Sequence, residues 1–416
     1  MNSHSLVYIY FHMSFRAFLK KGLRREDPVS TGLGLVTVKN KDVQQLTDVQ
    51  LYAETCLDVS IWSMDVNKSG ILCGCDDGSI YLLSSELTQI QVFTSAHKGP
   101  VISVTWHLDG IHFISVGLDR CVKVWSLSSI SSRHSNTPIL SVPHSCAVTA
   151  ACFDPRAVSI DDTSPSSVWL FSTGTDGRLR AWRGPLLDQY ESVASQGSSD
   201  CQPSALAARL DGSAALIALG GGSGSLSILR FADGQFSLKA TRKCKNRSGK
   251  HSDGERIVSV SWAGSDELLV STHDDRIRLL RYREREIIPI GKFKGHANHN
   301  KSPLSAYLVK QDETGKGNYS DESYLMSGSE CGSVFIWRRD ATGMGTEGEV
   351  DTGISCESFI AVEKPDKLTA CVPAPWEIEK IDSLARLPAC SVVATLQGVV
   401  RIFYNRGSPI SSLTPR

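Results

Sequence analysis

A short apolar strand recurs seven times along this chain, and a turn that usually contains Asp or Gly opens each copy. Successive copies end 42 to 66 residues apart. They occupy residues 77–83, 119–125, 176–182, 223–229, 274–280, 331–337 and 397–403. A repeat of about 40–45 residues, lengthened in places by loop insertions, is typical of the four-stranded blades of a β-propeller.

The second unit shows what surrounds the recurring strand. Apolar runs at 101–106, 112–116, 121–125 and 139–142 are separated by turn residues at Asp109, Gly110 and Gly117. One such sheet cannot bury both of its faces, whereas stacking seven sheets around an axis buries both. The pattern therefore predicts an all-β fold, a single seven-bladed propeller.

Ring closure calls for a strand from the start of the chain. The seventh unit runs through 399–404 and then turns polar, so it has no fourth strand of its own. The apolar run 33–39 is the candidate that fills this place and removes an exposed edge. We expect a poorly ordered leader at 1–30, the propeller at 31–405 and a tail at 406–416.

Two units carry nearly whole sets of four polar residues, and these sets resemble the tetrads of the WD-repeat family. The two sets are His97, Ser115, Asp119 and Trp125, and His144, Ser172, Asp176 and Trp182. In that family the four side chains hydrogen-bond in a line, which implies that these residues are structural. A His/Ser/Asp set can also indicate a hydrolase, but here it recurs once per blade and ends on Trp.

Three units depart from this pattern at the Asp position. Cys331, Ser223 and Gln397 stand there in the sixth, fourth and seventh units, although the sixth keeps His296 and Trp337. A thiol is a weak acceptor, so the sixth blade is expected to hold an incomplete network.

A narrower resemblance is to the family of WD-repeat protein 44. It rests on residues 61–64, 147–155, 241–249, 269–279, 294–296, 324–330 and 334–337. The family includes effectors of recycling-endosome Rab GTPases. The resemblance therefore implies a protein-interaction scaffold in endosomal membrane traffic, with a Rab-type small GTPase among its partners.

Composition adds limits on function. Lys plus Arg and Asp plus Glu each number 44, so there is no overall basic excess and nucleic acid is not an expected partner. The sequence has no phosphate-binding loop, zinc-protease motif or nucleophile elbow, so we expect no enzyme activity and no cofactor. Cys73 and Cys75 lie in a predicted strand without a second pair, which does not indicate zinc.

No stretch is long enough to span a bilayer, and we expect a cytoplasmic protein, associated with endosomes through peripheral membrane contact.

Partner binding is the expected role of one basic segment. It lies in the connection between the fourth and fifth units, on the expected top face, and a nearby residue of the fifth unit could join it. The candidates are Lys239, Arg242, Lys243, Lys245, Arg247, Lys250 and, in the fifth unit, Arg276. Solvated loop charge is the alternative reading of this segment.

The principal hypothesis is a monomeric propeller within a complex, acting in Rab-linked traffic. The alternative is a scaffold subunit of another complex, such as a ubiquitin-ligase adaptor or a ribosome assembly factor. No unit ends in the Trp-Asp-x-Arg sequence of ubiquitin-ligase substrate receptors. Insertions at 157–167 and 340–353 read as mobile surface loops.

Overall fold

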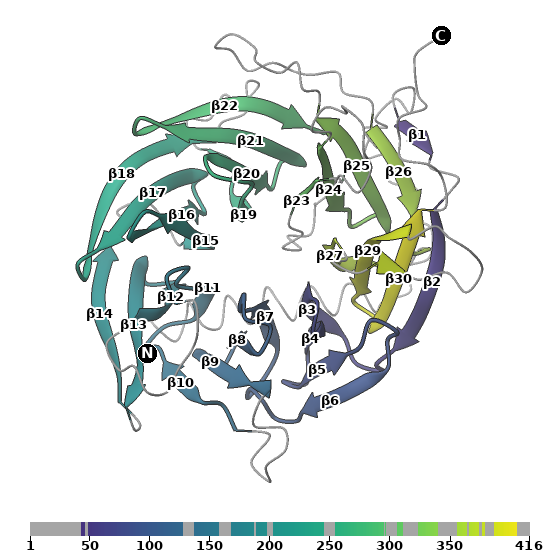
Figure 1. The fold of residues 1–416 in the computed structure, drawn as a ribbon, viewed down its shortest axis with the longest axis horizontal. Helices are drawn as coiled ribbons and strands as arrows, with labels where there is room; N and C mark the ends of the chain where they lie inside the picture. The colour runs from purple at the N-terminus through teal and green to yellow at the C-terminus, as the bar shows by residue number, and fades with distance from the viewer. Residues whose placement is uncertain are drawn as a thin grey trace, which may run out of the picture. The chain divides into compact units, whose positions relative to one another are not determined.

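A computed structural model gives the fold of the chain. The structure describes residues 43–45, 49–127, 137–157, 168–186, 189–197, 203–244, 254–294, 296, 306–310, 323–339, 356–363, 366–373, 377–378 and 387–405. Every strand belongs to one compact unit, Asp42–Arg416. Seven sheets, built mainly from antiparallel strands, follow one another around a centre, which confirms the predicted seven-bladed propeller (Figure 1).

The first four blades each contain four strands in chain order from the centre outward. Blade 1 holds β3 (Ile61–Asn67), β4 (Gly70–Cys75), β5 (Ile80–Leu83) and β6 (Gln89–Phe93). Blade 2 holds β7 (Val101–Trp106), β8 (His112–Gly117), β9 (Cys121–Ser126) and β10 (Leu140–Pro143). Blade 3 holds β11 (Val148–Phe153), β12 (Val168–Gly174), β13 (Arg178–Leu186) and β14 (Gln189–Gly197). Blade 4 holds β15 (Pro203–Asp211), β16 (Ala214–Gly221), β17 (Ser225–Ala232) and β18 (Gln235–Lys243).

The last two blades recruit strands from the start of the chain. Blade 5 is regular, with β19 (Ile257–Trp262), β20 (Glu267–Thr272), β21 (Arg276–Arg283) and β22 (Glu286–Phe293). Blade 6 holds β23 (Ala306–Lys310), β24 (Ser323–Gly328), β25 (Ser333–Arg339) and β26 (Cys356–Ile360), with β1 (Val43–Gln45) at its edge. Blade 7 holds β27 (Leu368–Val372), β28 (Glu377–Ile378), β29 (Leu387–Thr395), β30 (Val399–Asn405) and β2 (Val49–Cys56). The recurring strand of the sequence is the third strand from the centre in every blade, because β28 of blade 7 pairs with β29 outside this order.

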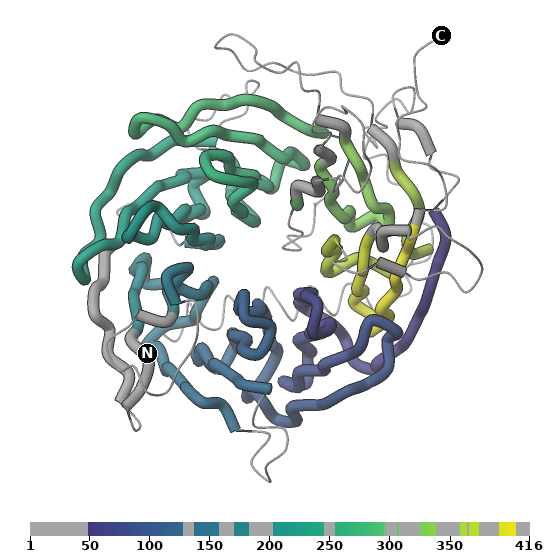
Figure 2. The backbone as a smooth tube through the Cα atoms, in the orientation of Figure 1, coloured from purple at the N-terminus to yellow at the C-terminus, as the bar shows by residue number. Residues whose placement is uncertain are grey.

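An N-terminal strand closes the ring, as predicted, but the expected segment was wrong. β2 runs antiparallel to β30, with Val49 opposite Asn405 and Cys56 opposite Val399. Figure 2 shows this purple strand beside the yellow end of the chain. The run 33–39, which lies outside the described residues, was chosen for its apolar content. An outermost strand faces solvent on one side, and β2 accordingly alternates between half-buried and exposed positions along most of its length.

The same N-terminal segment also reaches blade 6. β1 pairs in parallel with β26, from Val43 opposite Cys356 to Gln45 opposite Ser358. Residues 43–56 therefore tie together the outer edges of two blades. The boundaries predicted at residues 30 and 405 stay predictions, because 1–30 and 406–416 lie outside the described residues.

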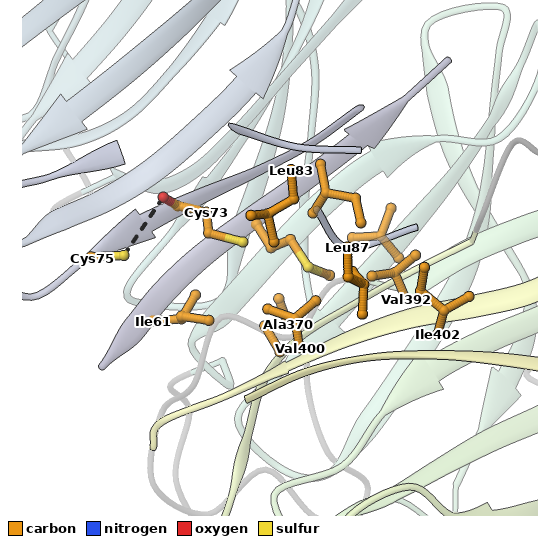
Figure 3. Packing of buried hydrophobic residues seen from close by; sticks show 13 residues of the cluster. Ile61, Cys73, Cys75, Leu83, Leu87, Ala370, Val392, Val400 and Ile402 are labelled. Atoms are coloured by element: carbon orange, nitrogen blue, oxygen red, sulfur yellow. Dashed lines mark hydrogen bonds between the residues drawn. The ribbon is translucent and has the colours of Figure 1, made fainter. Parts of the chain in front are cut away.

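The hydrophobic core lies between blades. At the closure, Ile61, Cys73 and Leu83 of blade 1 pack with Val392 and Ile402 of blade 7 (Figure 3). Cys73 and Cys75 are fully buried in this cluster, and burial raises the pKa of the Cys75 thiol to about 12. Such thiols act as small apolar side chains rather than as metal ligands.

Serines on the innermost strands join neighbouring blades. Ser63 donates its hydroxyl to the carbonyl of Val101 at 3.2 Å, and Ser204 donates to the carbonyl of Ile257 at 2.6 Å. Ser261 repeats the contact toward blade 6 by donating to the carbonyl of Ala306 at 3.1 Å. These bonds fix the approach of adjacent sheets near the ring centre, where apolar packing alone sets no register.

Candidate functional site

The two ends of the ring differ in what they carry. Antiparallel pairing places the turn between the second and third strands of a blade at the same end as the connection to the next blade. We call this end the top face and the opposite end the bottom face. Asp119, Asp176 and Asp274 lie in top-face turns, and His97, His144 and His296 lie in top-face connections.

Blade 2 assembles all four residues of its polar set. His97 Nε2 lies 2.7 Å from Ser115 Oγ, and its Nδ1 lies 2.9 Å from Asp119 Oδ1. Trp125 Nε1 donates to Ser115 Oγ at 2.8 Å. Burial alone would raise the pKa of Asp119, but the hydrogen bonds from His97 and from backbone amides outweigh it and lower that pKa to about 2. The carboxylate is therefore ionised and committed to internal partners.

Blade 3 divides the corresponding set. His144 Nε2 lies 2.8 Å from Ser172 Oγ, and Trp182 Nε1 donates to the same oxygen at 2.6 Å. Asp176 instead pairs with Arg180, whose Nη1 lies 3.2 Å from Oδ1. Burial, with the nearby Arg180 charge, lowers the pKa of His144 to about 4. This histidine is neutral at physiological pH.

Blade 6 lacks the acceptor that completes the set. Trp337 Nε1 donates to the carbonyl of Lys294 at 3.0 Å, and Ser327 Oγ donates to the carbonyl of Gly328 at 3.1 Å. The Nδ1 atom of His296 is buried with no hydrogen-bond partner. Burial lowers the pKa of His296 to about 4. With Cys331 at the Asp position, this ring is held by packing against Trp337.

Sequence reasoning missed a recurring arginine four residues after the turn Asp. Side chains four positions apart in an extended chain lie on the same side. Arg180 therefore contacts the carboxylate of Asp176, and Arg278 contacts that of Asp274. In blade 5, Arg278 Nη2 lies 3.0 Å from Asp274 Oδ2, and Arg276 contacts the same oxygen. Burial would raise the pKa of Asp274, but these bonds lower it. The Asp-x-x-x-Arg spacing is the signal that could have identified these pairs.

The candidate partner-binding residues fall into two groups. Lys239, Arg242 and Lys243 lie within β18, the outermost strand of blade 4, and not in the expected connection. Arg242 Nη1 donates to the carbonyl of Ile287 at 2.9 Å and so ties β18 to β22. Arg276 is paired with Asp274. Of these four residues, Lys243 is the exposed cation at the top end of its strand.

Lys245, Arg247 and Lys250 lie outside the described residues, but both ends of their segment are fixed. Cys244 donates its N–H to the carbonyl of Gly224 at 2.8 Å, and Glu255 donates to the carbonyl of Cys244 at 2.9 Å. The chain therefore leaves blade 4 and enters blade 5 at neighbouring points on the top face. Beside the re-entry point, burial lowers the pKa of Arg256. Insertions 158–167 and 340–353 also lie outside the described residues.

Comparisons with known proteins agree with this architecture. Residues 87–126 match the family described as WD domain, G-beta repeat, and this span contains the whole blade 2 set. The chain is 22% identical over 280 residues to E3 ubiquitin-protein ligase COP1 of Arabidopsis thaliana, covering 62% of this chain and 39% of the relative. It is 22% identical over 273 residues to SIR4-interacting protein SIF2 of Saccharomyces cerevisiae, covering 62% and 43%.

The chain thus spans about two-fifths of the length of these curated relatives. Among the described residues, no helix has the length and apolar content that a membrane crossing requires. Seven sheets, a recurring third strand and the matched repeat lead to one assignment. The chain is a seven-bladed β-propeller that contains a WD repeat at residues 87–126.

Proposed function

We propose that this chain is a non-enzymatic protein-interaction scaffold that binds partners on its top face at the junction of blades 4 and 5. The observation that carries the proposal is the anchored exit and re-entry of a basic segment there, next to the exposed Lys243. Cations grouped on a loop with fixed ends favour an acidic protein face or a phosphorylated segment as the bound element.

The arrangement of the polar sets supports a non-enzymatic role. In blade 2 the imidazole of His97 bonds to the carboxylate of Asp119 and to the hydroxyl of Ser115, which also accepts from Trp125, and His97 and Ser115 are buried. A catalytic serine needs its oxygen directed at a substrate. In blades 2 and 3 the serine oxygen instead bonds to the histidine and the tryptophan of its own set.

Rab-linked endosomal traffic is the cellular setting that we propose. It rests on the resemblance of residues 241–279, 294–296, 324–330 and 334–337 to the family of WD-repeat protein 44. In this setting the protein is cytoplasmic, reaches endosomes through peripheral contacts and has a Rab-type GTPase among its partners. The alternative is a scaffold in a ubiquitin-ligase complex, which the relative named E3 ubiquitin-protein ligase COP1 favours.

Affinity capture from cell lysate with mass spectrometry tests both settings. The test variant carries Lys243→Glu, Lys245→Glu and Arg247→Glu. A matched control carries Lys68→Glu, Arg283→Glu and Arg285→Glu, which reverse three exposed cations on the bottom face. We expect wild type and control to recover small GTPases and endosomal proteins, and the test variant to lose them.

Other outcomes are equally informative. Recovery of ubiquitin-ligase subunits by wild type and control, with their loss in the test variant, supports the alternative setting. Equal recovery by all three proteins contradicts the top-face site and leaves the segment as solvated charge.

A further inference from the structure

Two histidines and an aspartate converge at the bottom of blade 2. His107 and Asp109 lie in the turn between β7 and β8, His112 begins β8, and one ligand atom from each lies within 4.8 Å of the others. His107 Nδ1 is 2.8 Å from Asp109 Oδ2, and His112 Nδ1 is 2.7 Å from the same oxygen. Neither the partner-binding proposal nor the top-face polar sets use this cluster.

The hydrogen bonds of His107 fix which nitrogen carries a proton. Its Nε2 lies 2.6 Å from the carbonyl oxygen of Ala157 in blade 3, and a carbonyl can only accept. Nε2 is therefore protonated. In the neutral ring Nδ1 then bears a lone pair, and it accepts the N–H of Asp109 at 3.3 Å.

This assignment leaves two hydrogen-bond acceptor atoms close together. The lone pair of His107 Nδ1 and the carboxylate oxygen of Asp109 are 2.8 Å apart. Unscreened, two acceptors at that separation repel each other. A cation between them, either a proton that turns His107 into an imidazolium or a metal ion, relieves this repulsion.

Other contacts prepare the aspartate for a metal ion. Its Oδ1 accepts the N–H groups of Ile111 at 2.8 Å and His112 at 2.9 Å, so the two imidazole rings both approach the other oxygen, Oδ2. The bond from His107 Nε2 to a backbone carbonyl is the support that metal-bound histidines commonly have.

We propose that His107 Nδ1, Asp109 Oδ2 and His112 Nδ1 bind a divalent transition-metal ion at the bottom of blade 2. Imidazole and carboxylate donors suit Zn²⁺, Ni²⁺ or Co²⁺. With metal–ligand distances of about 2.1 Å, the two measured separations give angles of about 80° at the metal, nearer to three adjacent corners of an octahedron than to a tetrahedron. The side chains of Asp109 and His112 are 16% and 12% exposed, which leaves the remaining positions open to water.

The test uses the full chain carrying Cys56→Ser and Cys331→Ser, because these two exposed thiols would bind the probe metals themselves. After treatment with chelator, Zn²⁺ and Co²⁺ are titrated by calorimetry and by visible absorption of Co²⁺. We expect one equivalent to bind and the melting temperature to rise. Asp109→Asn, which keeps an oxygen for the two amides, and His112→Gln should each weaken binding at least tenfold.

Asp233→Asn is the control, since it removes an exposed carboxylate from a different turn. It should bind metal as the parent does. If Asp109→Asn does not fold, as judged by its melting curve without metal, His112→Gln carries the test. Absence of stoichiometric binding overturns the proposal, as does unchanged affinity in both ligand variants. Imidazole ¹⁵N shifts that show both nitrogens of His107 protonated at neutral pH and unchanged by added Zn²⁺ would identify the cation as a proton only.

Discussion

Asp65 of blade 1 accepts the backbone N–H of Trp106 of blade 2 at 2.7 Å, so one carboxylate joins two sheets. Burial raises the pKa of Asp65 to about 6, although the amides of Trp106 and Val66 act in the opposite direction. An acid whose folded pKa exceeds its unfolded pKa binds more protons in the folded state between those values. The contribution of Asp65 to stability is therefore largest below about pH 4 and falls as the pH rises to 6.

Replacing Asp65 with Asn removes this titration. We expect the free energy of unfolding of the wild type, relative to Asp65→Asn, to fall by up to about 3 kcal/mol between pH 4 and pH 7. Urea unfolding of both proteins at several pH values measures it. A difference that does not change with pH would contradict this account.

Two buried histidines give the opposite dependence. His144 and His296 have pKa values lowered to about 4, so the unfolded chain binds more protons than the folded chain between pH 4 and 6.5. Stability should rise with pH through this window, by up to about 3 kcal/mol for each group. His296→Leu removes a buried atom without a partner, so we expect a change within about 1 kcal/mol at pH 7 and reduced acid sensitivity. Acid unfolding followed by tryptophan fluorescence tests this, and an unaltered acid midpoint would argue against it.

The polar sets of blades 2 and 3 should differ in how much they contribute to the free energy of unfolding. Asp119 accepts hydrogen bonds from buried His97 and from the amides of Lys98 and Cys121, whereas Asp176 forms an ion pair with the partly exposed Arg180. We expect Asp119→Ala to destabilise the protein by about 2–4 kcal/mol and Asp176→Ala by less. Chemical denaturation of the two variants gives the comparison. Equal losses would mean that Arg180 does not divert Asp176 from the network.

Removal of the closing strand should affect the whole ring. A chain that starts at residue 57 lacks β2 and exposes β30, whereas a chain that starts at residue 42 keeps both N-terminal strands. We expect the shorter chain to melt at a lower temperature and to aggregate, because an unpaired edge strand recruits other chains. Calorimetry and light scattering compare the two. Similar melting of both chains would show that the ring does not depend on β2.

The repeating parts of the fold could be predicted from the sequence, and the exceptions could not. The third strands were found because each follows a turn and stays apolar, as in the run ending at Trp125. β2 was missed because its alternation, with Leu51 and Tyr52 exposed, is a weaker signal than a continuous apolar run.

The polar sets show a second limit of sequence reasoning. The same spacing of His, Ser, Asp and Trp produces a continuous network in blade 2 and a divided one in blade 3. The difference arises because Arg180 replaces Lys123 at the fourth position after the Asp, and the longer guanidinium takes the carboxylate. Likewise, Arg242 reads as a free cation in sequence and is bonded to the carbonyl of Ile287 in the structure.

The pairing of β2 with β30 also sets an order of events during synthesis. Gln50 leaves the ribosome early, and its partner Tyr404 follows 354 residues later. Until then β2 has no neighbour on that side, and blades 1 to 6 exist only as an open arc. At about 5–20 residues per second, β2 waits tens of seconds for β30. A nascent chain of this kind is exposed to domain swapping and to chaperones throughout that interval, and the closed ring can form only after β30 has been synthesised.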